Sequence, residues 1–443
     1  MRSSTGRWSR LPWLEVFVTI QFMWGAAMFV PGAQGVRSIV RALPYLSSLA
    51  LLLVYAHDGR RRSLPHGAVL VAAALLLLIA NLLHPTSRLG SGLGQCVFQL
   101  SIAAPLFWAH KAVRSIAHLQ RVLMLVFVWN LVGALLGVLQ VYYPDSFMPP
   151  AFNALGLQMN DLYVEALSYV GADGQVIVRP PGLTDSPGGA AIPGGLTALT
   201  GLVLLMYRRP WWQTAGILVA VAVGLNAVYL TQVRSVLLVV VCSGLIVIAA
   251  SLRGGQIGRA AGLMGLGAAA VVGAFLWAAA IGGEAIDSRF LGIRDSGAIA
   301  TYQSNRGYFL SQTLGELLDQ YPLGAGVGRW GMMTQYFPEH DAIDGPIHVE
   351  IQLTGWLLDG GLPMWLLYGG GVLVSLFGTW RVAVSGASTL RPAAQLTLAI
   401  QCVIAFLAMA GPAFNTQLGI QFWTFAAALQ GAAASMRQGP AKP

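Results

Sequence analysis

The chain has too few charged residues for a soluble protein of its length. Of its 443 residues 10% are charged, whereas 56% are hydrophobic and the mean hydropathy is +0.65. Soluble domains carry roughly 25% charged residues because they need a hydrated surface. Most of the surface of this chain is therefore expected to face lipid. The net charge of +9 would suggest nucleic-acid binding in a soluble protein, but in this chain we expect it to report membrane orientation, with no nucleic-acid partner.

Cysteine and familiar catalytic motifs are also scarce. The three cysteines lie in apolar runs and match neither a metal motif nor a disulfide framework, so they are interpreted as packing residues: Cys96, Cys242 and Cys402. The chain has no GxxxxGK(S/T), HExxH or GxSxG motif. The glycines of Gly324–Gly328 are interpreted as a flexible turn, and those of Gly369–Gly371 as a site of close helix packing. The scattered acidic residues indicate no metal site.

Long apolar runs fill most of the chain. A spanning helix needs about 20 mostly apolar residues. The candidate ranges are 13–30, 38–56, 67–84, 93–109, 119–142, 189–207, 211–230, 235–252, 260–281, 353–379, 394–411 and 416–435. We interpret the first as a retained span, because no small-residue cleavage site follows it. The prediction is an all-α polytopic membrane protein, a single domain over 1–443 with about twelve transmembrane helices.

Basic residues indicate the orientation of these spans. With the N-terminus inside, seventeen of the twenty-six basic residues lie in inner segments. Every inner segment then has at least two of them, so both termini are predicted to be cytoplasmic.

Two predicted outer loops, 143–188 and 282–352, are much longer than the others and hold fourteen of the seventeen acidic residues. Loops of this length are usually functional or disordered. In the second, apolar residues recur at helical spacing over Tyr308–Leu318, which predicts an amphipathic helix ended by Pro322-Leu323-Gly324. A structural lid and a substrate-contacting helix are equally compatible with this pattern.

Three arginines on the predicted outer side are candidates for binding an anion. Arg234 lies in a very short outer turn, against the orientation rule; its alternative role is snorkelling toward lipid headgroups. Arg306 is expected at the start of the amphipathic helix, where the helix dipole disfavours a cation, although a salt bridge with Asp295, Glu316 or Asp319 is the alternative. Arg179 precedes two prolines on a stiff extended segment.

His348 is the candidate general base. It lies just before the tenth predicted span, between Asp344 and Glu350, and an imidazole beside a carboxylate suits proton transfer near neutral pH. A structural role for a single histidine beside a span is the alternative. His340, in the polar stretch PEHDAIDG, is interpreted as solvated loop.

Four segments resemble the O-antigen ligase and Wzy-type polymerase superfamily of bacterial surface-glycan enzymes. In chain order they are RPPGLTDSPGGAA, LTQVRSVLLVV, SNRGYFLSQTLGELLDQYPLGAGVGRW and IHVEIQLTGWLLDGGLP. They cover roughly residues 179–370 and follow the order of that family. The chain differs from the family's usual pattern at Val233, where serine is usual, and at Val349, where asparagine or serine is common in ligases.

This resemblance implies a metal-independent glycosyltransferase of the GT-C type in the bacterial inner membrane, without a cofactor. It would take a glycan linked to undecaprenyl diphosphate as donor at the periplasmic face, and a glycan or another lipid-linked molecule as acceptor. His348 would act as the base in an inverting transfer. Arg234 and Arg306 would bind the diphosphate, Arg179 would contact glycan, and Glu350 would orient His348. Polysaccharide-assembly proteins are possible partners.

Two alternatives stay open at this level. Within the family, polymerisation is slightly favoured over ligation to lipid A core, because of the departure after His348. In another class, a polytopic transporter or flippase would bind its substrate near the midplane with buried ionisable groups. The predicted spans hold few such groups, chiefly Glu15, Arg41 and Asp359.

Overall fold

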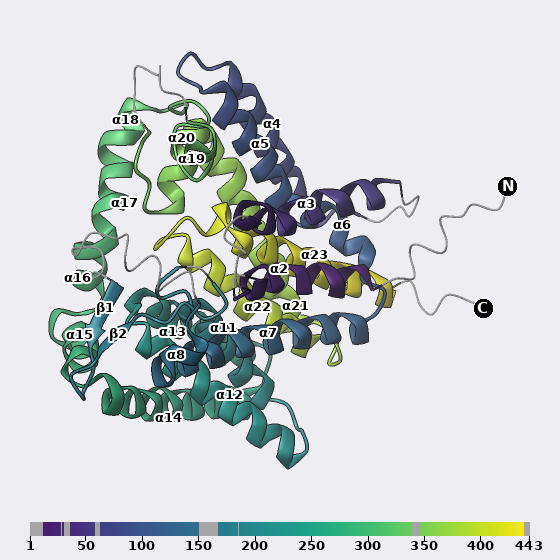
Figure 1. The fold of residues 1–443 in the computed structure, drawn as a ribbon. Coiled ribbons are helices and arrows are strands. Elements are labelled where there is room, and N and C mark those ends of the chain that lie inside the picture. Colours follow the sequence, from purple (N-terminus) through teal and green to yellow (C-terminus); the bar gives the residue numbers. More distant parts are fainter. Residues whose placement is uncertain are drawn as a thin grey trace.

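The computed structural model describes residues 12–27, 29–30, 36–57, 63–149, 167–184, 186–338 and 346–437. These residues are mainly helical (Figure 1). The longer helices are α2 (Trp13–Ala27), α3 (Arg37–Ala56), α4 (Ala68–Ala80), α5 (Leu89–Ala103), α6 (Pro105–Ala112), α7 (Ile116–Tyr142), α11 (Ala191–Leu205), α12 (Trp211–Leu230), α13 (Arg234–Arg253), α14 (Ile257–Gly282), α15 (Glu284–Ser296), α20 (Gln352–Met364), α21 (Gly370–Ser385), α22 (Arg391–Leu407) and α23 (Gln417–Arg437).

Short elements connect these helices. They are η2 (Asn81–Leu83), α8 (Pro144–Phe147), β1 (Ser168–Val170), β2 (Val176–Val178), α16 (Ala298–Tyr302), η3 (Gln303–Gly307), α17 (Tyr308–Gln312), η4 (Thr313–Leu317), α18 (Leu318–Gln320), α19 (Met333–Tyr336), η5 (Trp365–Gly369) and η6 (Ala413–Asn415).

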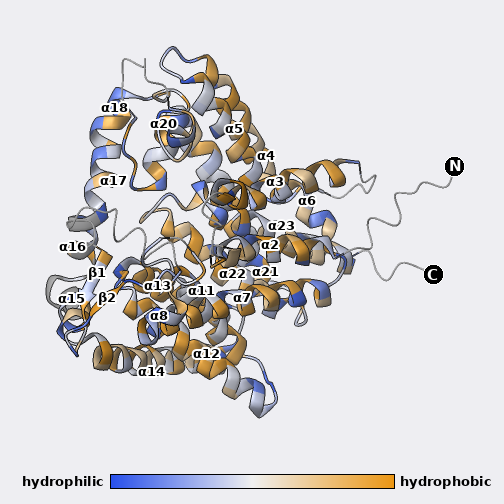
Figure 2. Cartoon of the chain, viewed as in Figure 1, coloured by the Kyte–Doolittle hydropathy of each residue, from blue (hydrophilic) through white to orange (hydrophobic). Residues whose placement is uncertain are grey.

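The chain is a polytopic membrane protein by the length and hydropathy of its helices. Seven helices of the described residues are long and apolar enough to cross a membrane, and three shorter apolar helices accompany them. Large apolar side chains point outward on several helices, as at Leu76, Leu366 and Leu373, which are 66–68% exposed. Figure 2 shows hydrophobic residues along most of the long helices. The all-α prediction is confirmed at this level. Each predicted span coincides with a helix, while the number twelve stays a prediction.

Helices α11, α22 and α23 form the buried centre of the bundle. Most residues of each are buried, because small side chains such as Ala and Gly let neighbours approach. Helix α11 packs on α7, α12 and α22, and α23 packs on α5, α6 and α22. At the other extreme, α14 buries only five of its residues. It lies at the edge of the bundle (Figure 1).

The second long loop contains the predicted amphipathic helix, but the helix begins earlier than the sequence suggests. Consecutive helical elements run from Ala298 to Gln320, with π-helical turns at Gln303–Gly307 and Thr313–Leu317. Thr313 is buried and its hydroxyl lies 2.6 Å from that of Thr354 on α20, so the helix packs against the bundle. Arg306 is therefore inside a helix and not at its start, because Gly297, with φ of 79°, sets the beginning.

The glycine-rich segment after this helix is rigidly packed, so its interpretation as a flexible turn is wrong. Residues 324–330 are all buried. Gly328 has φ of 82°, and a Cβ there would lie 2.3 Å from the backbone nitrogen of Gly92. Only glycine allows this contact at this backbone conformation. The prediction for the second cluster holds, since a Cβ on Gly371 would lie 2.7 Å from the side chain of Val71 on α4.

Helix α20 is broken in its middle, and the glycine-rich segment fills the break. Gly360 and Gly361 have non-helical backbone angles, and φ of Gly361 is 64°. The freed backbone groups pair with the loop: Ala325 donates to the Leu358 carbonyl at 2.8 Å, and Leu362 donates to the Pro322 carbonyl at 3.0 Å. The break is thus satisfied inside the protein, as non-helical backbone in a membrane requires.

A β-hairpin in the first long loop was not predicted. Strands β1 and β2 pair antiparallel, with Tyr169 opposite Ile177. The turn contains Asp173-Gly174, a dipeptide typical of hairpins, and Gly174 has φ of 80°. The hairpin is fastened to the end of α14 by a 2.9 Å hydrogen bond from Ala172 to the Ile281 carbonyl. This attachment fixes the segment that follows, which begins at Arg179.

Candidate functional site

Four arginines line one cavity at the end of the bundle near the hairpin. We call it the arginine cavity; its volume is about 370 Å³. Its lining residues are Arg179, Gln232, Val233, Arg234, Ser235, Leu238, Val239, Cys242, Arg289, Tyr302, Arg306, Phe406, Met409 and Ala410. Three of the arginines were predicted from sequence, and Arg289 was not. No carboxylate lines the cavity in the described part of the chain.

Arg234 is the first residue of α13, after a tight turn in which Gln232 has φ of 57°. A cation at a helix N-terminus faces the positive end of the helix dipole. The position at a helix start, which the sequence predicted for Arg306, is therefore occupied by Arg234. Its guanidinium donates to the carbonyl of Arg289 at 3.5 Å, which ties α13 to α15.

Arg179 follows strand β2 and reaches the cavity from the first long loop. Its backbone is fixed at both ends, since its N–H donates to the Leu167 carbonyl at 2.9 Å and its carbonyl accepts from Gly188 at 3.1 Å. Its Nε has no hydrogen-bond partner among the described residues. Pro180 and Pro181 follow Arg179, and a turn closed by a 3.2 Å hydrogen bond from Thr184 to the Pro181 carbonyl comes next.

Arg289 is the residue that sequence reasoning missed. It lies on α15, and its Nε donates to the Gln232 carbonyl at 3.2 Å. Ile286 and Phe290 on the same helix are buried. Their i, i+4 spacing in EAIDSRF marks an inward face, and Arg289 lies beside it. That short amphipathic pattern is the one signal in the sequence that indicates that Arg289 lies close to the bundle.

Arg306, Glu350 and His348 form a chain of contacts beside the cavity. One carboxylate oxygen of Glu350 pairs with the guanidinium of Arg306, and the other lies 2.7 Å from His348 Nε2. The predicted contact between Glu350 and His348 is therefore present. Arg306 pairs with Glu350, which was not among the three acids considered from sequence; the side chain of one of those, Asp295, lies outside the described residues. The His348 side chain is 74% exposed, so it is open to an incoming molecule.

Burial of the arginines makes the cavity strongly electropositive. Burial lowers the pKa values of Arg179, Arg289 and Arg306 below that of an ordinary arginine. For Arg289 the charges of Arg179 and Arg234 add to burial and bring the pKa to about 10. All these guanidinium groups remain charged at neutral pH. Partly desolvated like charges repel, so the cavity is built to be neutralised by an anion.

One wall of the cavity is apolar. Leu238 and Val239 come from α13, and Phe406 and Met409 from the end of α22. Cys242 also lines the cavity and is exposed, so its interpretation as a packing residue is wrong, whereas Cys96 and Cys402 are buried. The arrangement offers a cationic floor and an apolar side, which suits an anionic group attached to a hydrocarbon.

The remaining predicted residues fall in two groups. His340, Asp344 and the side chain of Asp295 lie outside the described residues. Asp359 is fully buried in α20 and accepts from Trp330 Nε1 at 2.8 Å and from Gln95 Nε2 at 3.3 Å. Within the described part of the chain, no group of three or more His, Cys, Asp or Glu could hold a metal ion.

Comparison of the chain with known protein families and with curated proteins finds no match. What the fold and the site establish together is a class of protein: a polytopic helical membrane protein with an arginine-lined cavity at one end of its bundle.

Proposed function

We propose that this chain is a membrane glycosyltransferase that uses a glycan linked to a polyprenyl diphosphate, of the undecaprenyl type, as donor. The observation that carries the proposal is the arginine cavity, in which Arg179, Arg234, Arg289 and Arg306 meet an apolar wall. A lipid diphosphate has the matching two parts, because its diphosphate is anionic and its chain is hydrocarbon. Arginine suits the diphosphate since its planar fork binds two phosphate oxygens at once.

In the proposed reaction an acceptor hydroxyl oxygen attacks the anomeric carbon of the donor sugar. The new glycosidic C–O bond forms as the bond to the diphosphate oxygen breaks, and the lipid diphosphate leaves with that electron pair. Negative charge grows on the leaving oxygens, where preorganised positive charge lowers the barrier. Attack opposite the leaving group inverts the anomeric configuration.

His348 takes the proton of the attacking hydroxyl in this proposal. Its Nε2 faces Glu350, 2.7 Å away, so a proton on Nε2 is held by the carboxylate and Nδ1 is left to accept. Glu350 would also stabilise the imidazolium that forms. Because Glu350 pairs with Arg306 as well, one carboxylate joins the base to the cavity that holds the leaving group. No metal or cofactor is required by this scheme.

The finer topology belongs to the same proposal. About twelve spans of a GT-C-like fold would place both termini in the cytoplasm and the arginine cavity at the periplasmic face of a bacterial inner membrane. The acceptor decides the particular reaction. Polymerisation adds repeat units to a surface glycan, as in O-antigen or exopolysaccharide synthesis, and ligation, the alternative, moves a finished glycan to lipid A core.

A transporter or flippase is the second candidate, favoured by the break in α20 beside the buried Asp359. Broken helices with buried ionisable groups are typical of transporters. Here, however, both carboxylate oxygens of Asp359 accept hydrogen bonds, and the break is filled by residues 322–325. These contacts support a structural role for Asp359, and the arginine cavity lies elsewhere.

Ligand protection of Cys242 tests the proposed diphosphate site directly. Farnesyl diphosphate should protect Cys242 from a charged methanethiosulfonate reagent in the full chain in detergent, because both would occupy the arginine cavity. Farnesol, which lacks the diphosphate, is the matched control and should protect far less. Equal protection by the two compounds, or none by either, overturns the diphosphate assignment.

A donor-by-acceptor assay with chain-length analysis tests the reaction. A ladder of products on the lipid diphosphate identifies a polymerase, and transfer to a separate acceptor identifies a ligase. His348→Ala should lower transfer by about 10²–10⁴-fold while farnesyl diphosphate still protects Cys242. Near-normal transfer by this variant removes His348 from the mechanism.

A further inference from the structure

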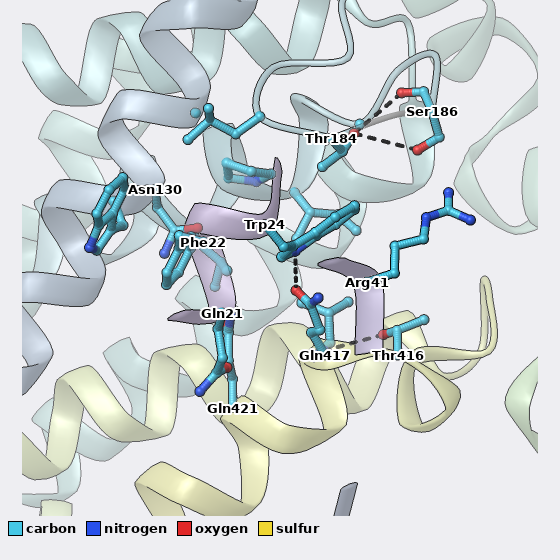
Figure 3. A pocket seen from close by; sticks show the side chains of 18 of the residues that line it. Gln21, Phe22, Trp24, Arg41, Asn130, Thr184, Ser186, Thr416, Gln417 and Gln421 are labelled. Carbon is cyan, nitrogen blue, oxygen red and sulfur yellow. Dashed lines mark hydrogen bonds between the residues drawn. The ribbon is translucent and has the colours of Figure 1, made fainter. Parts of the chain in front are cut away.

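A second cavity lies at the same end of the bundle, beside the arginine cavity. It is bounded by the starts of α11 and α23, the second half of α2, the first half of α3 and the middle of α7. We call it the aromatic–amide cavity; Figure 3 shows its side chains. Two segments of the chain contribute to both cavities. Residues 179–189 supply Arg179 to the first and Thr184 and Ser186 to the second, and residues 409–417 supply Met409 and Gln417.

The lining of this cavity combines flat aromatic walls with carboxamides. Phe22 and Trp129 are stacked with an interplanar angle of 4° and centroids 6.0 Å apart. Trp24 is fixed by a 2.8 Å hydrogen bond from its Nε1 to Gln417 Oε1, drawn as a dashed line in Figure 3. Among the described residues, the lining has no carboxylate and one cation, Arg41.

Two carboxamides in the lining are buried without full hydrogen bonding. Gln21 is 2% exposed, and neither its Nε2 nor its Oε1 has a partner among the described residues. Gln421 is 5% exposed and its Oε1 is also unpartnered. A buried amide without partners lowers stability, so such groups call for an explanation. Both side chains line the cavity, where a ligand with hydrogen-bond donors and acceptors would satisfy their unpartnered atoms.

We propose that the aromatic–amide cavity binds a neutral sugar ring of the glycan substrate, at a position separate from that of the diphosphate. A pyranose has an apolar C–H face that packs on aromatic rings, and hydroxyls that both donate and accept, as a carboxamide does. The volume of about 350 Å³ lies within the roughly 300–1,000 Å³ of small-molecule sites. The donor's first sugar is bonded to the diphosphate and must lie at the arginine cavity, so the second cavity takes another ring.

This inference rests on the proposed function for the identity of the ligand as part of a glycan, but its test is separate. The full chain in lipid nanodiscs is examined by saturation-transfer difference NMR with the methyl glycosides of glucose, galactose, mannose and N-acetylglucosamine. At least one glycoside should give transfer signals. Excess farnesyl diphosphate should leave those signals in place, since it is expected in the other cavity.

Gln21→Met is the decisive variant. It keeps the length of the side chain and removes two unpartnered polar atoms, so the thermal midpoint should equal or exceed that of the wild type. Affinity for the glycoside should fall at least tenfold, because its hydroxyls lose their partner. Gln401→Met is the matched control. Gln401 is also a buried glutamine with an unpartnered Oε1, but it does not line the cavity, so binding should be unchanged.

Each result decides one of the two proposals. Absence of any glycoside signal in the wild type, or equal affinity in Gln21→Met and Gln401→Met, overturns the sugar site. Displacement of the glycoside by farnesyl diphosphate also overturns it, because both would then share the arginine cavity. If glycoside binding depends on Gln21 but farnesyl diphosphate fails to protect Cys242, the sugar site stands and the diphosphate site falls.

Discussion

Arginines at the two ends of α13 show two different uses of the same side chain. At one end Arg234 lines a cavity with three other arginines. Near the opposite end, Arg391 and Arg259 contact backbone carbonyls and an aromatic ring. Arg391 donates to the carbonyls of Gly254 and Gly386 at 3.4 Å each, and Arg259 lies over the ring of Tyr207, 4.7 Å from its centroid.

The difference lies in how the charges are grouped. Arg391 binds carbonyls at helix ends and loops, where a cation stabilises the local fold. Arg234 and Arg289 also donate to backbone carbonyls, but they do so in a cavity that they share with Arg179 and Arg306. Positive charge can therefore indicate topology at one end of a bundle and binding at the other. Grouping of like charges around one cavity separates the two roles better than charge count.

The sharpest test of this contrast is conservative substitution at both ends. Arg234→Lys or Arg306→Lys should lower glycan transfer by about 10²-fold, because lysine keeps the charge but loses the bidentate fork. Arg259→Lys, the control, keeps a cation over Tyr207 and should stay within about threefold of the wild type. Transfer is measured with a lipid-diphosphate donor. Full activity of both cavity variants would exclude their role in diphosphate binding.

A second test measures ligand stabilisation. Saturating farnesyl diphosphate, at about 100 times its dissociation constant, should stabilise the folded chain by roughly 2.7 kcal/mol. Arg289→Met should remove most of this shift in the thermal midpoint, whereas Arg391→Lys should retain it. If both variants kept the shift, the ligand would bind outside the arginine cavity.

Much of the bundle and half of the site could be predicted from sequence, for identifiable reasons. Long apolar runs define helices one at a time, and Arg234 was conspicuous because it lay in a short turn. Arg289 lies in a long predicted loop, where only its position beside Ile286 and Phe290 indicates that it faces the bundle. The pairing of Arg306 with Glu350 joins residues 44 positions apart. Such a contact depends on how the helix of Ala298–Gln320 packs on α20, which local periodicity does not contain.

The third test concerns stability without ligand, and here the two ends should respond with opposite sign. Arg289→Met removes a desolvated charge from beside Arg179 and Arg234, together with the one hydrogen bond of its Nε to the Gln232 carbonyl. Relief of the repulsion should outweigh that bond and raise the free energy of unfolding by roughly 0.5–1 kcal/mol. Arg391→Met removes two hydrogen bonds to carbonyls and should lower it by about 1 kcal/mol. Thermal midpoints in detergent provide the measurement. Destabilisation by both substitutions would mean that Arg289 also has a structural role.

The smallest effect is a pH dependence that belongs to Arg289. Burial, and then the charges of Arg179 and Arg234, lower its pKa in the folded chain to about 10, well below that of an ordinary arginine. The unfolded chain therefore holds this proton more tightly, and stability rises as pH passes upward through 10. Relative to pH 7, the gain in the free energy of unfolding at pH 10 is roughly 0.4 kcal/mol.

Other groups titrate in this range, so the quantity to measure is the difference in stability between the wild type and Arg289→Met from pH 7 to 10. That difference should narrow with rising pH, because the wild type progressively loses the charge that the variant lacks. A constant difference would show that neither burial nor the neighbouring arginines lower the pKa of Arg289, and the contrast between the two ends of α13 would then rest on geometry alone.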